Sequence, residues 1–558
     1  MNIKRIKNLT ATICLIFCAY FLPFFASVSA FSPGFKTITS TVPFLANTDI
    51  KKIDQLVSTT IESFSVPGVS IGIIKDEKTL HLKGYGQLNI ETKTRINEES
   101  IFKVASNSKA FTSAALALFV EVGKLKWSDK VIQYLPEFKM EDLWVTKEFN
   151  IRDLLTHRIG LRVGAGYLML WPEPTLFSRD DVINNLRYFQ SVGSFRDESV
   201  YDNLLYIVAG QVIAEISGMS WEMFVEENIF KKLGMKKCFA GGVNTKNHTN
   251  LAAPHGIVED SLILLQKNLM NNKTNLMAAA GGIKCSAKDL LTWVEMLLNL
   301  GKSNSSKKLL SEKQVKELWK PVTSLPISSN MRTYDKTDYR YYALGWRVSS
   351  YQGEHRVSHT GTLGGFMSQI IMFPTRKLGI VILTNQQSAS ARNALARNLM
   401  NIILNQLPDR RQKLDKDWLK YYIDVNNKSY TKSFVTSNVN KHSESRISNN
   451  KKLYLGGYED SWFEKITFSE ENDLIMFKSE ISPRMIVKVY FHGEHINGGT
   501  TPWIKWNDRS FEADVWLFNS HNELGEPIIT MKAISSKTDF SFDFQDLNFK
   551  KINRILSI

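Results

Sequence analysis

The segment FKVASNSKAFTSAALALFVEVGKL, residues 102–125, carries the pattern from which the fold and the chemistry of this chain can be argued. Ser106 stands three residues before Lys109, and the apolar run that follows predicts a helix over residues 110–122 that ends at Gly123. On a helix this spacing puts both side chains on one face, and the helix dipole favours an oxyanion at Ser106. A helix-capping serine beside a lysine with its stem along the apolar surface fits equally well. The segment alone leaves a nucleophile and a cap open.

A second serine competes for the role of nucleophile. Residues 68–72 read GVSIG and match the G-x-S-x-G nucleophile elbow around Ser70. That motif requires a strand that ends at the serine, turns sharply and begins a helix. Here the β-branched run continues to Ile74, and the charged turn at residues 75–78 leads into a second run, which predicts a hairpin. We therefore expect Ser70 to be an ordinary strand residue.

The chain's 558 residues exceed one ordinary domain, and a hydrophobic content of 43% is typical of a folded protein. Mainly helical sequence lies between strands at both ends of residues 48–405, which predicts an α+β domain with an antiparallel sheet flanked by helices and a helical subdomain. Residues 406–450 are predicted to be a charged linker with a short helix around Trp418. Aromatic runs about ten residues apart in 451–558 predict a small all-β sandwich or barrel.

The N-terminus has the pattern of a secretory signal peptide. Lys4, Arg5 and Lys7 precede an apolar stretch, and small residues at 27–30 offer a cleavage site, so we interpret 1–30 as a signal peptide and 31–47 as a lead-in. We expect a secreted or periplasmic protein without a stable membrane span after cleavage. An uncleaved membrane anchor is the alternative.

The charge distribution and the cysteine content indicate which kinds of binding partner and metal or disulfide site to expect. The formal net charge of +15 comes from lysines scattered along the chain, which indicates solubility and attraction to anionic envelopes rather than a nucleic-acid groove. Cys238 and Cys285 remain after signal cleavage; they are too few for a disulfide scaffold, and one bridge between them stays open. His492 and His495 lack the zinc-binding H-E-x-x-H spacing. We predict no metal and no cofactor.

Two later segments add polar residues at element boundaries. Residues 201–203, Tyr-Asp-Asn, directly precede an apolar run that predicts a helix. Residues 359–362, His-Thr-Gly-Thr, end one strand and begin a glycine-rich turn, where a glycine lets a backbone or ligand approach closely. Taken singly, Tyr201 fits packing, Asn203 a helix cap and His359 a hydrogen-bonded strand residue.

In this order, S-x-x-K, Y-x-N and H-T-G resemble the serine β-lactamase and penicillin-binding-protein superfamily, over about residues 48–405. The likeness is greatest to the class C branch with its esterase, D-aminopeptidase and D,D-carboxypeptidase relatives. Residues 151–157 (IRDLLTH), 280–283 (AGGI) and 342–346 (YALGW) support it. The aromatic C-terminal part is similar to the small β-domain often appended to such hydrolases.

The resemblance implies a role for each motif residue. Ser106 would attack a carbonyl and form an acyl-enzyme, with Lys109 or Tyr201 as the base; the resemblance leaves the choice open. The backbone N–H groups of Ser106 and Thr362 would form an oxyanion hole. Asn203 would bind the polar rim of the substrate, and His359, Gly361 and Thr362 would line the substrate site.

One position departs from many relatives. Where β-lactamases and carboxypeptidases often carry lysine, this chain has His359, which is mostly uncharged at neutral pH if its pKa is unperturbed. The first hypothesis is therefore a secreted serine hydrolase that cleaves an ester or amide in a small molecule or peptide. The alternatives are a β-lactamase or D,D-carboxypeptidase acting on penicillins or peptidoglycan peptides, and a non-turnover penicillin-binding or wall-binding module. The natural substrate and the oligomeric state are not predicted.

Overall fold

The computed structural model describes most of the chain from residue 44 to residue 552. The gaps within this range are 259, 266–275, 304–307, 411, 437–452, 492–501, 507–513, 535–541 and 543. The predicted signal peptide, most of the predicted lead-in, and His492 and His495 lie outside the described residues.

The framework of the large domain is an antiparallel sheet built from both ends of the domain. Its described strands, in order across the sheet, are β2 (Lys78–Gly86), β1 (Gly68–Lys75), β13 (Leu378–Thr384), β12 (Phe366–Phe373), β11 (Glu354–Leu363), β10 (Arg347–Tyr351), β9 (Arg340–Tyr342) and β8 (Thr323–Ser324). The first strand of the domain pairs with the last, with Ile71 opposite Ile382. The predicted hairpin and the predicted antiparallel sheet are therefore confirmed.

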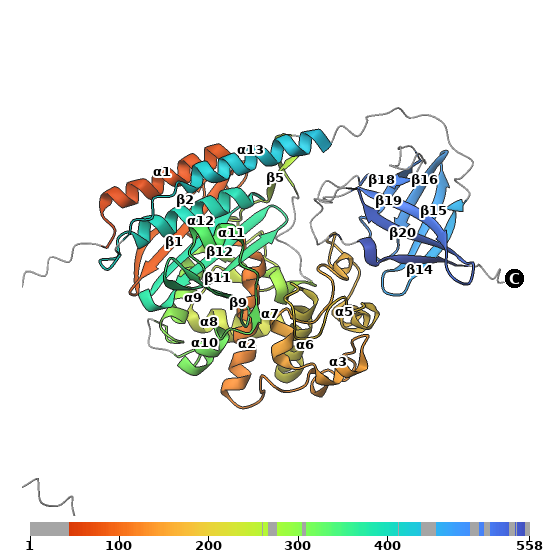
Figure 1. The fold of residues 1–558 in the computed structure, drawn as a ribbon, viewed down its shortest axis with the longest axis horizontal. Helices are drawn as coiled ribbons and strands as arrows, with labels where there is room; N and C mark the ends of the chain where they lie inside the picture. The colour runs from red at the N-terminus through yellow and green to blue at the C-terminus, as the bar shows by residue number, and fades with distance from the viewer. Residues whose placement is uncertain are drawn as a thin grey trace, which may run out of the picture. The chain divides into compact units, whose positions relative to one another are not determined.

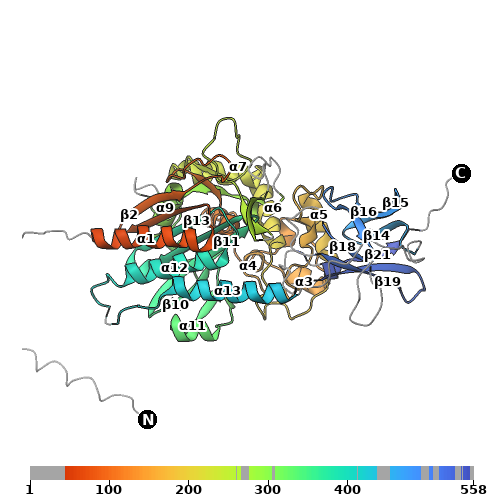
Figure 2. The ribbon, with the colours of Figure 1, turned by 90° about the horizontal axis from the view of Figure 1, so that it is seen from above.

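Three helices cover one face of this sheet (Figures 1 and 2). They are α1 (Asn47–Phe64), α12 (Ala389–Leu404) and α13 (Trp418–Thr436), and the apolar faces of α1 and α12 share a core with β1 and β13. The helix expected to be short around Trp418 runs for 19 residues and packs on α12. The Trp418 ring is buried there, with the Arg397 guanidinium 4.0 Å from its centre. This packing stabilises a helix that is longer than its polar sequence predicts.

The other face of the sheet is covered by helical sequence, as predicted. The remaining described α-helices of this part of the domain are α2 (Ser108–Glu121), α3 (Leu143–Glu148), α4 (Ile151–Leu155), α5 (Arg179–Asn185), α6 (Leu204–Ser217), α7 (Trp221–Val225), α8 (Lys231–Leu233), α9 (Ala287–Leu298) and α10 (Glu312–Leu318). Helix α11 (Ser329–Tyr334) instead lies beside α13, where Tyr334 packs against Trp418. Helix α9 lies directly on the sheet, with Leu291 and Val294 against two strand glycines. A Cβ at Gly72 would come within 2.8 Å of Leu291, and a Cβ at Gly379 within 2.3 Å of Val294, so no larger residue fits at either position. Two glycines thus set the distance between the helix and the sheet.

A smaller sheet leads into the segment that contains Ser106. It consists of β3 (Ile101–Lys103), β7 (Lys284–Ser286) and β4 (Cys238–Phe239). Cys238 lies opposite Cys285 in the antiparallel pair, and the two form a disulfide, which the sequence had left open. A separate hairpin pairs β5 (His255–Val258) with β6 (Ser261–Leu264).

The C-terminal part forms a closed antiparallel barrel, drawn in blue in Figure 1. Its described strands are β14 (Gly456–Asp460), β15 (Glu464–Glu471), β16 (Leu474–Ser479), β17 (Ile486–Tyr490), β18 (Trp503–Ile504), β19 (Val515–His521), β20 (Pro527–Ala533) and β21 (Asn548–Lys551). Alternate apolar side chains such as Ile466 and Phe468 fill its interior. The prediction of a small all-β domain is confirmed, as a barrel.

No single helix among the described residues is long and apolar enough to cross a membrane. Helix α6 and the segment Trp221–Leu233 would together be long and apolar enough, but the two are bent by 74° relative to each other.

The disulfide gives a testable stability effect. It closes a loop between cysteines 47 residues apart, so reduction should lower the free energy of unfolding of the large domain by about 2–4 kcal/mol. Calorimetric melts with and without a thiol reductant measure this. A Cys238→Ser/Cys285→Ser double variant should melt like the reduced protein and ignore the reductant. Equal melting of oxidised and reduced wild type would contradict the prediction.

Candidate active site

Ser106 lies on a single 3-10 turn, residues 105–107, between β3 and α2. The helix begins at Ser108, two residues earlier than predicted, so Ser106 precedes its first turn. Ala105 adopts a φ of +49°, a conformation that side chains other than glycine rarely take. The Ser106 side chain is only partly buried, whereas Ala105 and Asn107 beside it are enclosed. A strained, fixed backbone thus presents the hydroxyl at the edge of the core.

The turn is fastened to the third motif on β11 and to the neighbouring strand β12. Ser368 on β12 donates a hydrogen bond to the Val104 carbonyl (2.6 Å) and accepts one from the Asn107 amide (2.7 Å). A Cβ at Gly361 would lie 2.3 Å from the Val104 carbonyl oxygen, so any larger residue would push β11 away from the turn. The predicted close approach at Gly361 is therefore made by the backbone beside Ser106.

Residues 359–362 all lie within β11, which continues to Leu363, three residues beyond Thr360, where the sequence had predicted the strand to end. Gly361 pairs with Ser368, and the reversal falls at Gly364 and Gly365, both with positive φ. The Thr362 side chain is exposed at the end of the strand.

Lys109 points back along α2 toward Ser106 and is completely buried. Its Nζ lies 3.5 Å from Ser106 Oγ and donates to Asn203 Oδ1 (2.5 Å) and to the Ala280 carbonyl (2.9 Å). The same nitrogen lies 4.8 Å from the centre of the Tyr201 ring. One amine therefore joins the first motif, the second motif and the predicted AGGI segment.

Burial is the largest influence on the charge of this amine. It lowers the pKa of Lys109 from its ordinary value, and the nearby Arg347 charge adds to the lowering. Tyr201, through its charge and a hydrogen bond, and the Asp202 carboxylate raise the pKa of Lys109 again. An amine in such a place exchanges its proton more readily than an exposed lysine.

The second motif lies directly before α6, as predicted. Asn203 makes no capping hydrogen bond to the helix; its side chain turns to Lys109 instead. The helix is capped by Asp202, whose Oδ1 accepts from the Leu205 N–H (2.9 Å). The interpretation of Asn203 as a helix cap is thus wrong. Asp202 is the capping residue, and the sequence analysis did not identify it.

His157 holds the second motif from behind. Its Nδ1 accepts a hydrogen bond from the Asp202 N–H (3.1 Å), and its ring lies 4.3 Å from the rings of both Tyr201 and Tyr342. Burial, followed by the charges of Lys109 and Arg347, holds the pKa of His157 well below its usual value, so the imidazole is neutral.

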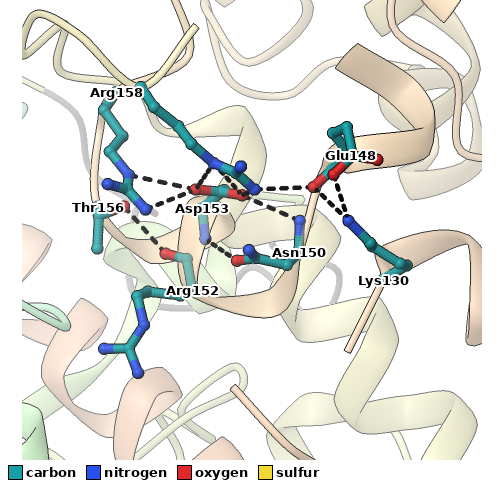
Figure 3. Close-up of polar contacts among 8 residues, drawn as sticks. Lys130, Glu148, Asn150, Arg152, Asp153, Thr156 and Arg158 are labelled. Atoms are coloured by element: carbon teal, nitrogen blue, oxygen red, sulfur yellow. Dashed lines mark hydrogen bonds and ion pairs between the residues drawn. The ribbon is translucent and has the colours of Figure 1, made fainter. Parts of the chain in front are cut away.

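The segment before His157 is anchored by the buried carboxylate of Asp153 (Figure 3). Asp153 accepts hydrogen bonds from the Asn150 N–H and from the guanidinium groups of Arg158 and Arg196. Arg196 lies shortly before Tyr201, so this ion-pair network ties the two ends of the segment 158–196 to Asp153. The predicted IRDLLTH segment therefore fixes the position of the second motif.

The imidazole of His359 is engaged within the protein. It is 1% exposed; Nδ1–H donates to the Thr360 carbonyl (2.7 Å), and Nε2 accepts from the Tyr342 hydroxyl (2.9 Å). Burial is the main cause that holds the pKa of His359 well below its ordinary value. The side chain is therefore neutral and has both nitrogens occupied, whereas the sequence had suggested that it faces a substrate.

Two arginines belong to the site although no motif pointed to them. Arg347 on β10 donates to Thr360 Oγ1 (3.1 Å) and lies 5.8 Å from the ring centre of Tyr201. Arg392 on α12 is buried behind the strand and donates to Thr362 Oγ1 (3.3 Å); burial lowers the pKa of Arg392 to about 10. The only available signal was that Arg347 directly follows the YALGW phrase.

Ser70 lies apart from these groups. It is fully buried in the middle of β1, between β2 and β13, and the strand continues to Lys75. No helix begins there, so the prediction that the G-x-S-x-G match is not an elbow is confirmed.

Comparison with known proteins gives consistent results. The family model described as Beta-lactamase matches residues 53–403. Unguisins hydrolase ungD' of Aspergillus campestris is 27% identical over 66% of this chain and 68% of its own length, and Protein flp of Staphylococcus aureus is 25% identical over 62% of this chain and 64% of its own length, slightly under two thirds. The octameric penicillin-binding protein homologue from Pyrococcus abyssi covers 90% of this chain and 100% of its own, with 17% identity and a TM-score of 0.56, which supports the fold.

The Asp153 network gives a second prediction. Asp153→Asn leaves two partly buried guanidinium groups without their countercharge, so the free energy of unfolding should fall by about 3 kcal/mol. Glu148→Gln is the control, because its ion pair with Lys130 lies at the surface, and its melt should match that of wild type. Calorimetry compares them. Equal melts of the two variants would show that the network does not anchor the segment.

Proposed function

The chain belongs to the Beta-lactamase family, and on that premise we propose that it is a secreted serine hydrolase that cleaves an ester or amide bond through an acyl-enzyme on Ser106. The observation that carries the proposal is the position of Lys109 Nζ, 3.5 Å from Ser106 Oγ and 2.5 Å from Asn203 Oδ1. Secretion, into the periplasm or medium, rests on the sequence pattern of residues 1–30 alone.

In the first step Ser106 Oγ attacks the carbonyl carbon of the substrate. Its proton passes to the base, either a neutral Lys109 amine or a Tyr201 phenolate beside the Lys109 ammonium. The distance of 3.5 Å is long for a hydrogen bond, as is common before a substrate tightens the site. Because burial lowers the pKa of Lys109, its neutral form is accessible closer to neutral pH than that of a surface lysine.

The developing oxyanion needs donors that are already in place. The backbone N–H groups of Ser106 and Thr362 are the proposed pair, and the close approach of Gly361 to Val104 holds the two segments together. Arg392 supports the far side of the pair through Thr362 Oγ1. Collapse of the intermediate releases the alcohol or amine, which takes the proton from the base. Water then attacks the acyl-enzyme while the same base accepts its proton. The ester bond to Ser106 breaks, the acid is released, and the base returns the proton to Ser106 Oγ.

The polar groups around the serine favour a substrate with an uncharged acyl portion. Asn203 is uncharged and accepts a hydrogen bond from Lys109, while His359 is neutral and engaged with Tyr342. We therefore assign His359 a positioning role and retain esters and amides as the first substrate class. That one relative is named as a hydrolase of unguisins supports hydrolysis as the reaction type.

One observation favours β-lactamase or carboxypeptidase action as the second candidate. Arg347 places a permanent cation next to Thr360 and the Tyr201 ring, where a lysine of the third motif would otherwise supply the charge. A substrate carboxylate could pair with this guanidinium in the bidentate manner typical of arginine. Hydrolysis of penicillins that is lost selectively in Arg347→Gln would favour this class.

Replacement of the proposed nucleophile gives the direct prediction. Ser106→Ala should reduce hydrolysis of p-nitrophenyl acetate to background and leave the thermal melt close to that of wild type, because the side chain is partly exposed and only a hydroxyl is removed. Ser70→Ala is the matched control, since it removes a hydroxyl from a strand and should retain activity.

The reverse result, an inactive Ser70 variant and an active Ser106 variant, would overturn the proposal. The time course separates turnover from sensing. Release of one p-nitrophenol per protein followed by a flat line would indicate a module that acylates but does not deacylate.

A further inference from the structure

Asp202 is a buried carboxylate between two residues of the proposed site. It is 1% exposed, and its Oδ1 accepts the Leu205 N–H at the start of α6. Its own N–H donates to His157 Nδ1. Its Oδ2 is buried without a hydrogen-bond partner among the described residues. A helix cap needs only one oxygen, so the cap does not account for the second.

The surroundings of Asp202 contain few charges, and these belong to the site. The titratable and charged groups from the elements packed around it are Lys109 on α2, His157 after α4, Tyr201, Tyr206 on α6, Tyr342 on β9 and Arg347 on β10. His157 is neutral, and Tyr206 and Tyr342 are buried phenols whose pKa values are raised by burial. The cation that acts on Asp202 is Lys109.

We propose that Asp202 is a positioning residue whose carboxylate sets the protonation of Lys109 and so fixes the acid limit of hydrolysis. The inference rests on the proposed function and deepens it. It adds a third ionisable group to the machinery, at the middle position of the second motif.

The sign of the effect follows from the charges. Burial raises the pKa of Asp202 to about 6, while the backbone N–H of Leu205, the Lys109 charge and the backbone N–H of Leu204 act against it. Once ionised, Asp202 raises the pKa of Lys109. An anion disfavours proton loss from the Lys109 ammonium. Removal of the negative charge must therefore make the base available at lower pH.

The coupling between Asp202 and the base also affects the shape of the wild-type pH profile of kcat/KM. As pH rises, Asp202 loses its proton and the pKa of the base rises with it, so the two titrations oppose each other. The acid limb of kcat/KM should therefore be shallower than a one-proton curve. Without the carboxylate, the limb should become an ordinary one-proton curve.

The test compares variants that keep the helix cap and lose the charge. Asp202→Asn and Asp202→Ser both retain an oxygen that can accept the Leu205 N–H. Asp289→Asn is the control: Asp289 is also buried, accepts a backbone N–H from Lys237, and has charged neighbours Lys288 and Glu99 that lie outside the site. The readout is kcat/KM for p-nitrophenyl acetate as a function of pH, with the full protein.

In both Asp202 variants we expect the acid limb to lie at a pH about one unit lower than in wild type. At a pH on that limb, each variant should therefore retain about ten times more of its own plateau kcat/KM than wild type does. Asp289→Asn should keep the wild-type limb. An unchanged limb in the Asp202 variants, with or without a uniform loss of rate at all pH values, would overturn the inference, because a purely structural role produces only such a uniform loss.

Two further outcomes are separable. If neither uncharged variant folds, the wild-type limb decides: a shallow limb supports the inference and a one-proton limb overturns it. Failure of the proposed function would give a different result: the Ser106→Ala variant would hydrolyse p-nitrophenyl acetate as fast as wild type. Failure of this inference leaves Ser106-dependent hydrolysis intact with a pH profile that ignores Asp202.

Discussion

The site depends on one constraint, the complete withdrawal of the Lys109 ammonium from water. An amine in the core requires acceptors at fixed positions, and here they come from the second motif and from the AGGI segment before β7. Those contacts bring together parts of the chain that are about 94 and 171 residues away from Lys109 in sequence. The buried charge thus specifies the arrangement, and the same burial makes the amine a useful proton acceptor beside Ser106.

Around this amine the protein combines close backbone packing and neutral rings with two further charges, the Asp202 carboxylate and the Arg347 guanidinium. Gly361 lets β11 approach the turn before Ser106 closely, and the His157 ring packs at a tilt against the Tyr201 ring. Both imidazoles near the site are held neutral, so the cations of the site are Lys109, Arg347 and Arg392. A permanent guanidinium and a tunable amine have different tasks: the first suits recognition of an anion, and the second suits proton transfer.

Much of this arrangement could be predicted from the sequence, because short patterns with local causes carry it. The charged hairpin turn after β1, the apolar run of α2 and the three motifs each indicate their element without tertiary information. Asp202, Arg347 and Arg392 could not be found in this way, since their importance comes from burial beside residues far along the chain. The sequence predicts a helix around Trp418 but not the full length of α13, which depends on the packing of Trp418 against α12. His359 matched its motif, yet its ring faces Tyr342, a contact that only the paired strands create.

The central claim is that Ser106 is the reactive hydroxyl of this protein. Intact-mass measurement after exposure to a fluorophosphonate, followed by peptide mapping, tests it most directly. The account predicts a single adduct on the peptide that contains Ser106, formed more slowly when Lys109 is replaced by alanine. An adduct on Ser70, or inactivation with Ser106 unmodified, would contradict it.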